Sequence, residues 1–258
     1  MDIVNKTDTS VELVQQIAKF AEISERHLLL YLDDQINRTD REAARCRIEE
    51  NTRKGWKPLP WDLEKIRTDK DVHAFFCAGN VVDSQAVPQY LKDSARGYDS
   101  MIYVDQTFLC GHAILTASTM AHECRHAWQY YERPLTYFGN LVLNWVIEPH
   151  TTPAEQDAEG FAKRASIDLF GEATVNNFAQ DRINKGSSEE IWMWQRFAKS
   201  ALAENYDLET QTRNLLFQYA TQMRRAQESL KIDIPMLETT ASHLSSADAI
   251  SFLRQAKR

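Results

Sequence analysis

The pattern of apolar and polar positions predicts a mostly helical chain with one clear strand. Along 115–131, apolar residues recur every three or four positions without an intervening proline or glycine, which predicts one amphipathic helix. The segment 100–105 is rich in β-branched and aromatic residues and predicts a strand just before that helix. The same criteria predict further helices over 10–32, 40–53, 137–148, 153–169, 187–205 and 208–232.

Residues that cap helices mark two of these boundaries. Thr9 or Ser10 can cap the first helix, because a hydroxyl accepts a hydrogen bond from the unsatisfied backbone N–H groups of the first turn. Thr152 and Pro153 mark the start of the 153–169 helix, since proline suits the first helical position. We therefore expect the α+β class, with helices predominating.

Composition narrows the class of function. The 258 residues carry a formal net charge of −7, which argues against a general nucleic-acid or membrane-surface binder. The amino terminus lacks a basic and then apolar signal segment, and the longest apolar run, 138–147, is too short to span a bilayer. The cysteines are scattered and form no Cys-x-x-Cys pair. We therefore expect a cytoplasmic protein with free thiols.

The predicted helix over 115–131 contains His122-Glu123-Cys124-Arg125-His126. Because residues four apart share one face of a helix, the imidazoles of His122 and His126 can bind a single cation. Glu123 lies about 100° further round, where its carboxylate can reach a metal-bound water. Two neutral nitrogens suit Zn²⁺, and a neighbouring carboxylate can accept the proton of the water.

A third zinc ligand is expected on the helix over 153–169. Glu155 and Glu159 share one face of it, whereas Asp157 points about 200° away from Glu155 and cannot serve the same metal. Glu155 also fits a second interpretation, because Thr152-x-x-Glu155 is a capping box in which the glutamate only satisfies backbone donors. With Glu155 as ligand, Glu159 is expected to accept the free N–H of a liganding imidazole.

The His-Glu-x-x-His pair, followed by Glu155-x-x-Ala158-Glu159-x-x-Ala162, resembles the gluzincin class of zinc metallopeptidases. The resemblance covers about 102–169, and it implies that Glu155 is the third zinc ligand and that Glu159 supports a ligand histidine. The order of strand, motif helix and glutamate helix is similar to small cytosolic members of the class, including the ImmA/IrrE-like peptidases of bacteria.

A zinc-dependent endopeptidase with Glu123 as the catalytic base is what this resemblance implies. The zincin-like core is expected over 71–175, between helical segments over 1–70 and 176–258. In zinc peptidases an edge strand beside the metal binds substrate as an added strand; 100–105 is a candidate, and a strand that merely covers the helix fits equally well. The expected substrate is a protein or peptide, and the flanking helices are candidates for binding a regulatory protein.

Two alternatives stay open from the sequence. In the first, a SprT-like arrangement, His150 replaces Glu155 as the third ligand. In the second, a peptidase-like fold binds zinc, or no metal, and acts as an interaction or regulatory protein without proteolysis. Glu123 favours hydrolysis over the second alternative, because hydrolysis needs this carboxylate and metal binding does not. The sequence identifies neither the substrate nor the group that stabilises the oxyanion.

Overall fold

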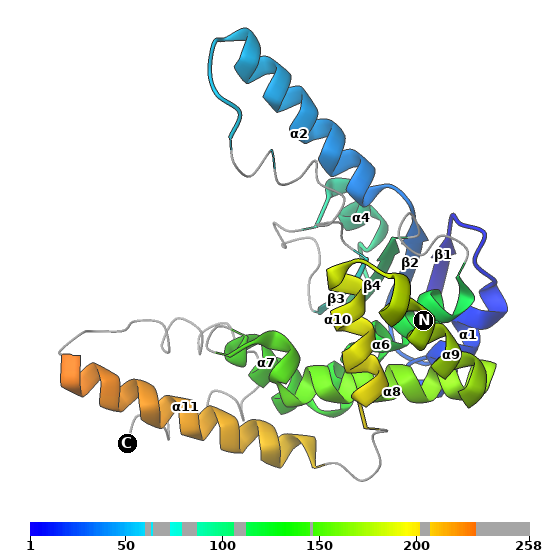
Figure 1. The fold of residues 1–258 in the computed structure, drawn as a ribbon, viewed down its shortest axis with the longest axis vertical. Coiled ribbons are helices and arrows are strands. Elements are labelled where there is room, and N and C mark those ends of the chain that lie inside the picture. The colour runs from blue at the N-terminus through cyan, green and yellow to red at the C-terminus, as the bar shows by residue number, and fades with distance from the viewer. Residues whose placement is uncertain are drawn as a thin grey trace. The chain divides into compact units, whose positions relative to one another are not determined.

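The computed structural model describes residues 1–59, 63, 73–78, 87–105, 112–144, 147–201 and 207–230. Over these ranges the protein is a mostly helical α+β fold with a four-stranded mixed sheet (Figure 1). The strands are β1 (Asp2–Asn5), β2 (Leu28–Asp33), β3 (Ala74–Ala78) and β4 (Ser100–Asp105). The helices are α1 (Val11–Phe20), α2 (Ile36–Arg53), α4 (Gln89–Ser94), α6 (Ala113–Glu132), α7 (Pro134–Leu143), η3 (Pro149–Thr151), α8 (Pro153–Phe170), α9 (Glu172–Lys185), α10 (Ser188–Lys199) and α11 (Leu208–Leu230).

The chain divides into two compact units, 1–124 and 125–258, and the boundary falls inside helix α6. The first unit contains the sheet, and the second contains the helices from the end of α6 onward. This boundary lies within the predicted central segment 71–175, so the three-part division of the chain stays a prediction. None of the described helices is both long enough and apolar enough to cross a membrane.

The sheet of the first unit has the strand order β1-β2-β4-β3, with β3 antiparallel to β4 and the other pairs parallel. All six residues of β2 and of β4 are buried. The strand predicted over 100–105 is confirmed as β4, and of the two alternatives for it, the substrate-binding edge strand does not hold. Strand β4 pairs with β2 on one side and β3 on the other, so its backbone groups are already used within the sheet.

The helix predicted over 10–32 is only half correct. Ser10 caps α1 by accepting a hydrogen bond from the backbone N–H of Leu13, and the helix ends at Phe20. Glu22 then adopts a positive φ of 59°, which turns the chain away from the helix. The apolar run from Leu28 onward forms the buried strand β2, because a short continuous apolar run fits a covered parallel strand as well as a helix.

The predictions for the helices that matter to the motif are largely confirmed. Helix α6 covers the whole predicted span 115–131, and α8 begins at Pro153 and ends at Phe170. The helix predicted over 137–148 lies earlier, as α7, because Pro134 occupies its first turn. Helices α10 and α11 correspond to the two predicted over 187–205 and 208–232, whereas α9, β1 and β3 were not predicted. The chain after residue 230 lies outside the described residues.

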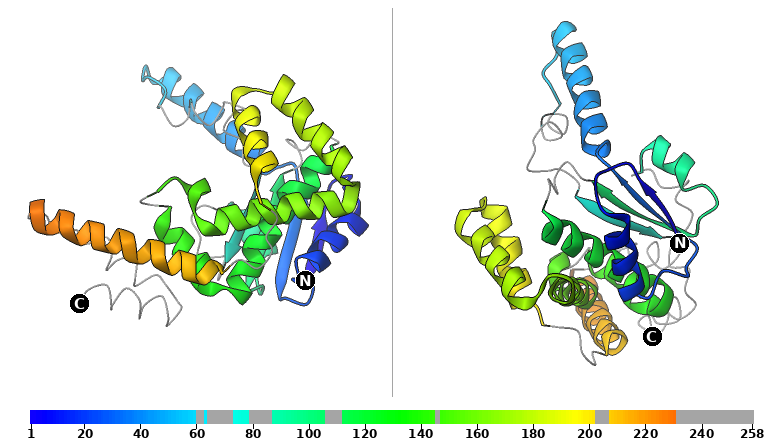
Figure 2. Two further views of the ribbon diagram at one scale, coloured as in Figure 1. Left: turned by 60° about the horizontal axis from the view of Figure 1, so that its bottom comes forward. Right: turned by 90° about the vertical axis from the view of Figure 1, so that its right-hand side faces the viewer.

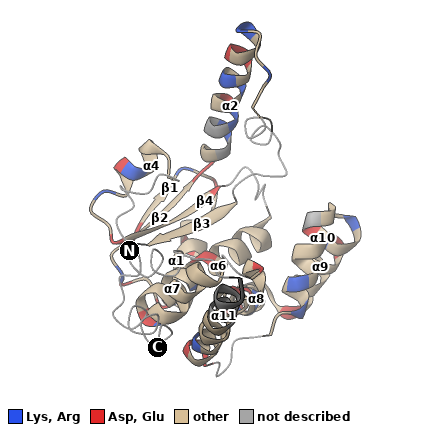
Figure 3. Ribbon diagram, turned by 90° about the vertical axis from the view of Figure 1, so that its left-hand side faces the viewer, with Lys and Arg blue, Asp and Glu red and all other residues tan. Residues whose placement is uncertain are grey.

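Helix α2 carries basic and acidic residues interspersed along its length, as Figure 3 shows. Glu42, Arg45, Arg47, Glu49 and Glu50 are all exposed. Charges of both signs on one helix are typical of a solvated face.

Gly139 allows α7 and α11 to pack closely within the second unit. A Cβ atom at this position would overlap Cγ2 of Thr212, whose side chain is buried in α11. We expect Gly139→Ala to lower the free energy of unfolding by roughly 1–3 kcal/mol, since overpacking outweighs the better helix propensity of alanine. Chemical denaturation measures this loss. In a Thr212→Ser background, which removes Cγ2, the same substitution is expected to cost much less; an equal cost in both backgrounds would rule out this contact as the cause.

Candidate metal centre

Helix α8 is central to the second unit and carries the predicted third ligand. Helices α7, α9, α10, α11 and η3 all contact it (Figure 2). Thr152 caps α8 by accepting a hydrogen bond from the backbone N–H of Glu155, and Pro153 occupies the first turn. Small residues line the buried side of this helix, including Ala154, Ala158 and Gly160, and this allows its neighbours to approach.

Three side chains converge at a candidate metal centre. His122 and His126 lie one turn apart on α6, and each offers a ring nitrogen. Glu155 of α8 offers a carboxylate oxygen. These ligand atoms all lie within 4.8 Å of one another. His126 is buried and the other two are partly buried. His126 Nε2 and Glu155 Oε1 are 3.5 Å apart.

This geometry fits a small tetrahedral cation. A zinc ion with bonds of about 2.1 Å holds neighbouring ligand atoms about 3.4 Å apart. The separation of 3.5 Å between His126 and Glu155 is close to that value. Two imidazole nitrogens and one carboxylate oxygen are also a donor set that zinc accepts at catalytic sites, where a fourth position remains for water or substrate. The residues therefore fit zinc, and both predicted histidines and Glu155 are brought together.

Gln129 determines which nitrogen of His126 faces the centre. Its side-chain Nε2 donates hydrogen bonds to the carbonyl oxygen of Ala154 and to Oδ2 of Asp157, both at 2.9 Å. Its Oε1 therefore faces Nδ1 of His126, 2.9 Å away, and accepts the proton on that nitrogen. In a neutral imidazole this leaves the lone pair on Nε2, which is the atom next to Glu155.

Asp157 is held in turn by Arg125. The guanidinium donates two hydrogen bonds to the carboxylate, from Nε to Oδ2 at 2.7 Å and from the terminal nitrogen to Oδ1 at 3.0 Å. The Asp157 side chain is fully buried, and Arg125 lies over the Trp128 ring at 3.6 Å from its centroid. The bidentate pair leaves Asp157 little freedom to move, so it orients the Gln129 amide firmly. Asp157 does not belong to the group of His122, His126 and Glu155 that could hold a metal, in agreement with its predicted exclusion.

Glu155 has a partner of its own that the sequence did not reveal. Asn140 of α7 donates a hydrogen bond from Nδ2 to Glu155 Oε1 at 3.2 Å, while its Oδ1 accepts one from the Thr152 hydroxyl. A complete capping box would also have the Glu155 carboxylate accept a hydrogen bond from the backbone N–H of Thr152. That N–H instead donates to the carbonyl of Pro149, so this part of the capping-box interpretation is wrong. Thr152 is a cap, and Glu155 directs its carboxylate toward His126 and Asn140.

The structure places Glu159 beside an arginine. It forms an ion pair with Arg196 of α10, and Arg196 also lies over the Trp192 ring, 4.5 Å from its centroid. Burial lowers the pKa of Arg196 below its usual value, and the charge of Glu155 opposes that effect. Nδ1 of the His126 imidazole has Gln129 as its hydrogen-bond partner. A role for Glu159 beside His122 stays a prediction.

Three further predicted residues have defined positions. Glu123 is partly exposed on α6, next to His122. His150 packs edge-on against the Trp192 ring. Among the described residues, the group that could hold a metal contains Glu155 as its third member and does not contain His150. Cys124 is buried, and its pKa is raised well above the usual value by burial and then by the charge of Glu123. Its thiol stays protonated, and the side chain belongs to the buried hydrophobic core.

The residues that sequence analysis missed are the two amides, Gln129 and Asn140. Gln129 lies three residues after His126, so helical spacing alone places it on the same side of α6. Asn140 carries no comparable signal, because its link to Glu155 depends on how α7 packs against α8.

Comparison with known proteins found no relative of this chain. No family model matches it, and neither a curated protein nor a solved structure matches it. The interpretation of the site therefore depends on its own geometry and chemistry.

We expect Gln129→Leu to weaken zinc binding by about 10- to 100-fold, because the Nδ1 proton of His126 loses its acceptor and the ring loses its orientation. Competition with a chromophoric zinc chelator measures this directly and requires no activity. The matched control is Gln156→Leu, at an exposed glutamine of α8 whose amide donates to the backbone carbonyl of Thr151. Equal zinc affinity of the two variants would contradict the role given to Gln129.

Proposed function

We propose that this protein is a zinc-dependent peptidase that hydrolyses peptide bonds of a protein substrate. The observation that carries the proposal is the convergence of His122, His126 and Glu155 around one point, with Glu123 next to the first histidine on the same helix. The gluzincin resemblance of the motif supports the same class of chemistry, since there too a glutamate from a second helix completes the zinc ligands.

In this proposal His122, His126 and Glu155 hold the zinc ion. When bound, zinc lowers the pKa of a coordinated water toward neutrality and polarises the scissile carbonyl. Glu123 accepts a proton from the attacking water and later gives it to the leaving amine nitrogen, so that the amide bond breaks with no net gain or loss of protons. Gln129 and Asn140 hold His126 and Glu155 in position throughout.

The decisive experiment combines metal analysis with hydrolysis of a peptide mixture. The full chain is loaded with zinc, the zinc content is measured, and the mixture is followed by mass spectrometry with and without a chelator. We expect about one zinc per chain and new peptide termini that a chelator prevents. Absence of zinc after loading would refute the metal centre. Zinc without hydrolysis of any peptide would favour the alternative of a zinc-binding interaction or regulatory protein.

A further inference from the structure

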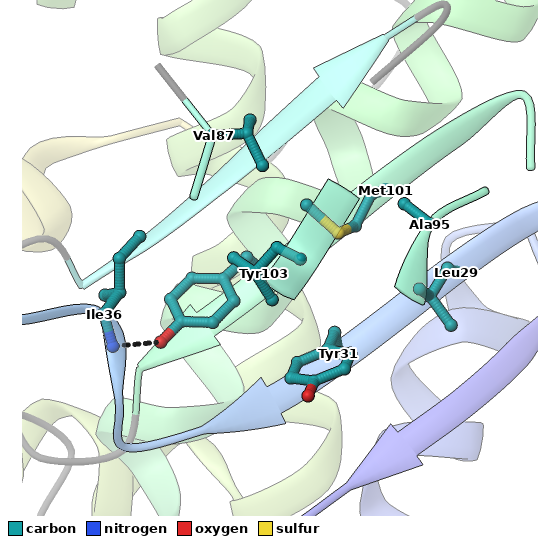
Figure 4. Packing of buried hydrophobic residues seen from close by; sticks show 8 residues of the cluster. Leu29, Tyr31, Ile36, Val87, Ala95, Met101 and Tyr103 are labelled. Carbon is teal, nitrogen blue, oxygen red and sulfur yellow. Dashed lines mark hydrogen bonds between the residues drawn. The ribbon is translucent and has the colours of Figure 1, made fainter. Parts of the chain in front are cut away.

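The buried pair of Arg125 and Asp157 in the second unit differs from buried polar contacts that hold elements together. In the first unit, the Tyr103 hydroxyl accepts a hydrogen bond from the backbone N–H of Ile36 at 3.3 Å, which joins β4 to the start of α2 within a cluster of buried side chains (Figure 4). The Arg125–Asp157 pair instead leads, through the amide of Gln129, to a histidine that could hold the metal.

Stability alone does not explain why the second unit buries this pair. The Asp157 side chain is 0% exposed and that of Arg125 is 15% exposed. Removing two charges from water carries a large cost in free energy, and an apolar pair of similar volume is often equally stable or more stable. A buried ion pair is therefore better explained by what it positions than by the free energy of unfolding that it adds.

One carboxylate oxygen joins the ion pair to the amide. Oδ2 of Asp157 accepts a hydrogen bond from Nε of Arg125 at 2.7 Å and another from Nε2 of Gln129 at 2.9 Å. Oδ1 accepts from a terminal nitrogen of the guanidinium at 3.0 Å. The two parallel bonds fix the plane of the carboxylate, and with it the direction in which Oδ2 faces the amide. Without Arg125 the carboxylate is free to rotate away from Gln129.

The amide of Gln129 has both of its donors in use. One N–H of Nε2 bonds Asp157, and the other donates to the carbonyl oxygen of Ala154 at 2.9 Å. A carbonyl oxygen and an ionised carboxylate only accept hydrogen bonds, so both partners require the nitrogen end of the amide. The oxygen end is left to face Nδ1 of His126, 2.9 Å away, and that nitrogen then carries the proton.

Two aromatic rings hold the guanidinium in place. Arg125 lies over Trp128, 3.6 Å from the centroid of its ring, and 5.0 Å from the ring centroid of Phe161. Trp128 belongs to α6 and Phe161 to α8. Both helices that carry candidate metal ligands therefore help to position the arginine.

We propose that Arg125 is a positioning residue of the candidate metal centre. Acting through Asp157 and Gln129, it fixes the proton of the His126 ring on Nδ1. The lone pair then lies on Nε2, which is 3.5 Å from Oε1 of Glu155. The inference rests on the metal centre of the proposed function and is independent of peptidase activity. It gives a role to one of the two residues that the His-Glu-x-x-His pattern leaves open.

The first measurement is the tautomer of His126 in the zinc-free full chain. The ¹⁵N shifts of the ring report it at about pH 8.5, where a free imidazole is neutral, and His126→Asn assigns the signals by their loss. An imidazole without an ordered partner prefers its proton on Nε2. We expect the wild type to carry the proton on Nδ1 and Arg125→Met to lose that preference. Methionine keeps an apolar stem against Trp128 but removes every donor to Asp157.

The second measurement is zinc affinity, by competition with a chromophoric chelator. We expect Arg125→Met to bind zinc about tenfold more weakly than the wild type, at the lower end of the range for residues that orient a metal ligand. Because the effect passes through Gln129, Arg125→Met is expected to cause no further loss in a Gln129→Leu background. Arg133→Met is the matched control and is expected to bind zinc as the wild type does. Arg133 also lies over Trp128, 5.3 Å from its centroid, but donates to the backbone carbonyl of Glu132.

Three results would overturn the proposal. The first, a wild type with the His126 proton on Nε2, requires no variant. The second is an unchanged tautomer in Arg125→Met. The third is an equal loss of zinc affinity from Arg125→Met with and without Gln129→Leu, which indicates a general effect on stability. If Arg125→Met does not fold, Arg125→Lys replaces it, because lysine keeps the charge but cannot make two parallel bonds to a carboxylate. A wild type that binds no zinc refutes the metal centre itself, and the tautomer of the zinc-free chain still tests Arg125.

Discussion

Glu123→Gln is expected to lower the rate of peptide hydrolysis by roughly 10²- to 10⁴-fold while about one zinc per chain is retained. The reason is that the amide of glutamine has nearly the shape of the carboxylate but cannot accept a proton from water at neutral pH. The residues that could hold the metal are His122, His126 and Glu155, so the substitution removes none of them. A loss of rate without a loss of metal is the signature of a general base.

The measurement is the initial rate on a cleavable peptide, together with zinc content of the same preparation. Glu132→Gln, at the carboxyl end of the same helix, is the matched control and is expected to leave the rate unchanged. Hydrolysis by Glu123→Gln at the rate of the wild type would exclude Glu123 as the base. Retention of substrate by the inactive variant would also allow the natural substrate to be captured.

Glu155→Ala is expected to lower zinc affinity by more than about 100-fold, because loss of a direct ligand costs more than loss of a group that only orients one. The substitution leaves two histidines on α6, which bind zinc weakly by themselves. It also removes the hydrogen-bond acceptor of Asn140. Chelator competition measures the affinity, and circular dichroism in the presence of chelator checks that the helices remain.

Glu159→Ala is the control for this variant, because Glu159 lies one turn further along α8 and pairs with Arg196. We expect it to keep zinc binding within about tenfold of the wild type. A loss as large as that of Glu155→Ala would instead support the predicted role of Glu159 beside a liganding histidine. Retention of tight zinc binding by Glu155→Ala would exclude it as the third ligand.

The sequence by itself determined the parts of this site that depend on local geometry. The motif helix α6 and the glutamate helix α8 follow from apolar spacing, capping residues and the absence of helix breakers, all of which act within a few residues. The shared face of His122 and His126 follows from the helical repeat alone. The choice of Glu155 over Asp157 could also be made there, since two residues of one helix separated by about 200° cannot reach one metal.

The tertiary structure alone decided what links distant segments. The run at 28–33 is a strand because it is covered within the sheet, and β4 is an inner strand because β3 pairs with it; neither pairing is encoded in local periodicity. Asn140 reaches Glu155 only because α7 packs on α8, and Asp33 meets Asp105 only through the parallel register. Spacing along a helix is a local property of the chain, whereas these contacts join residues brought together only when the whole chain packs.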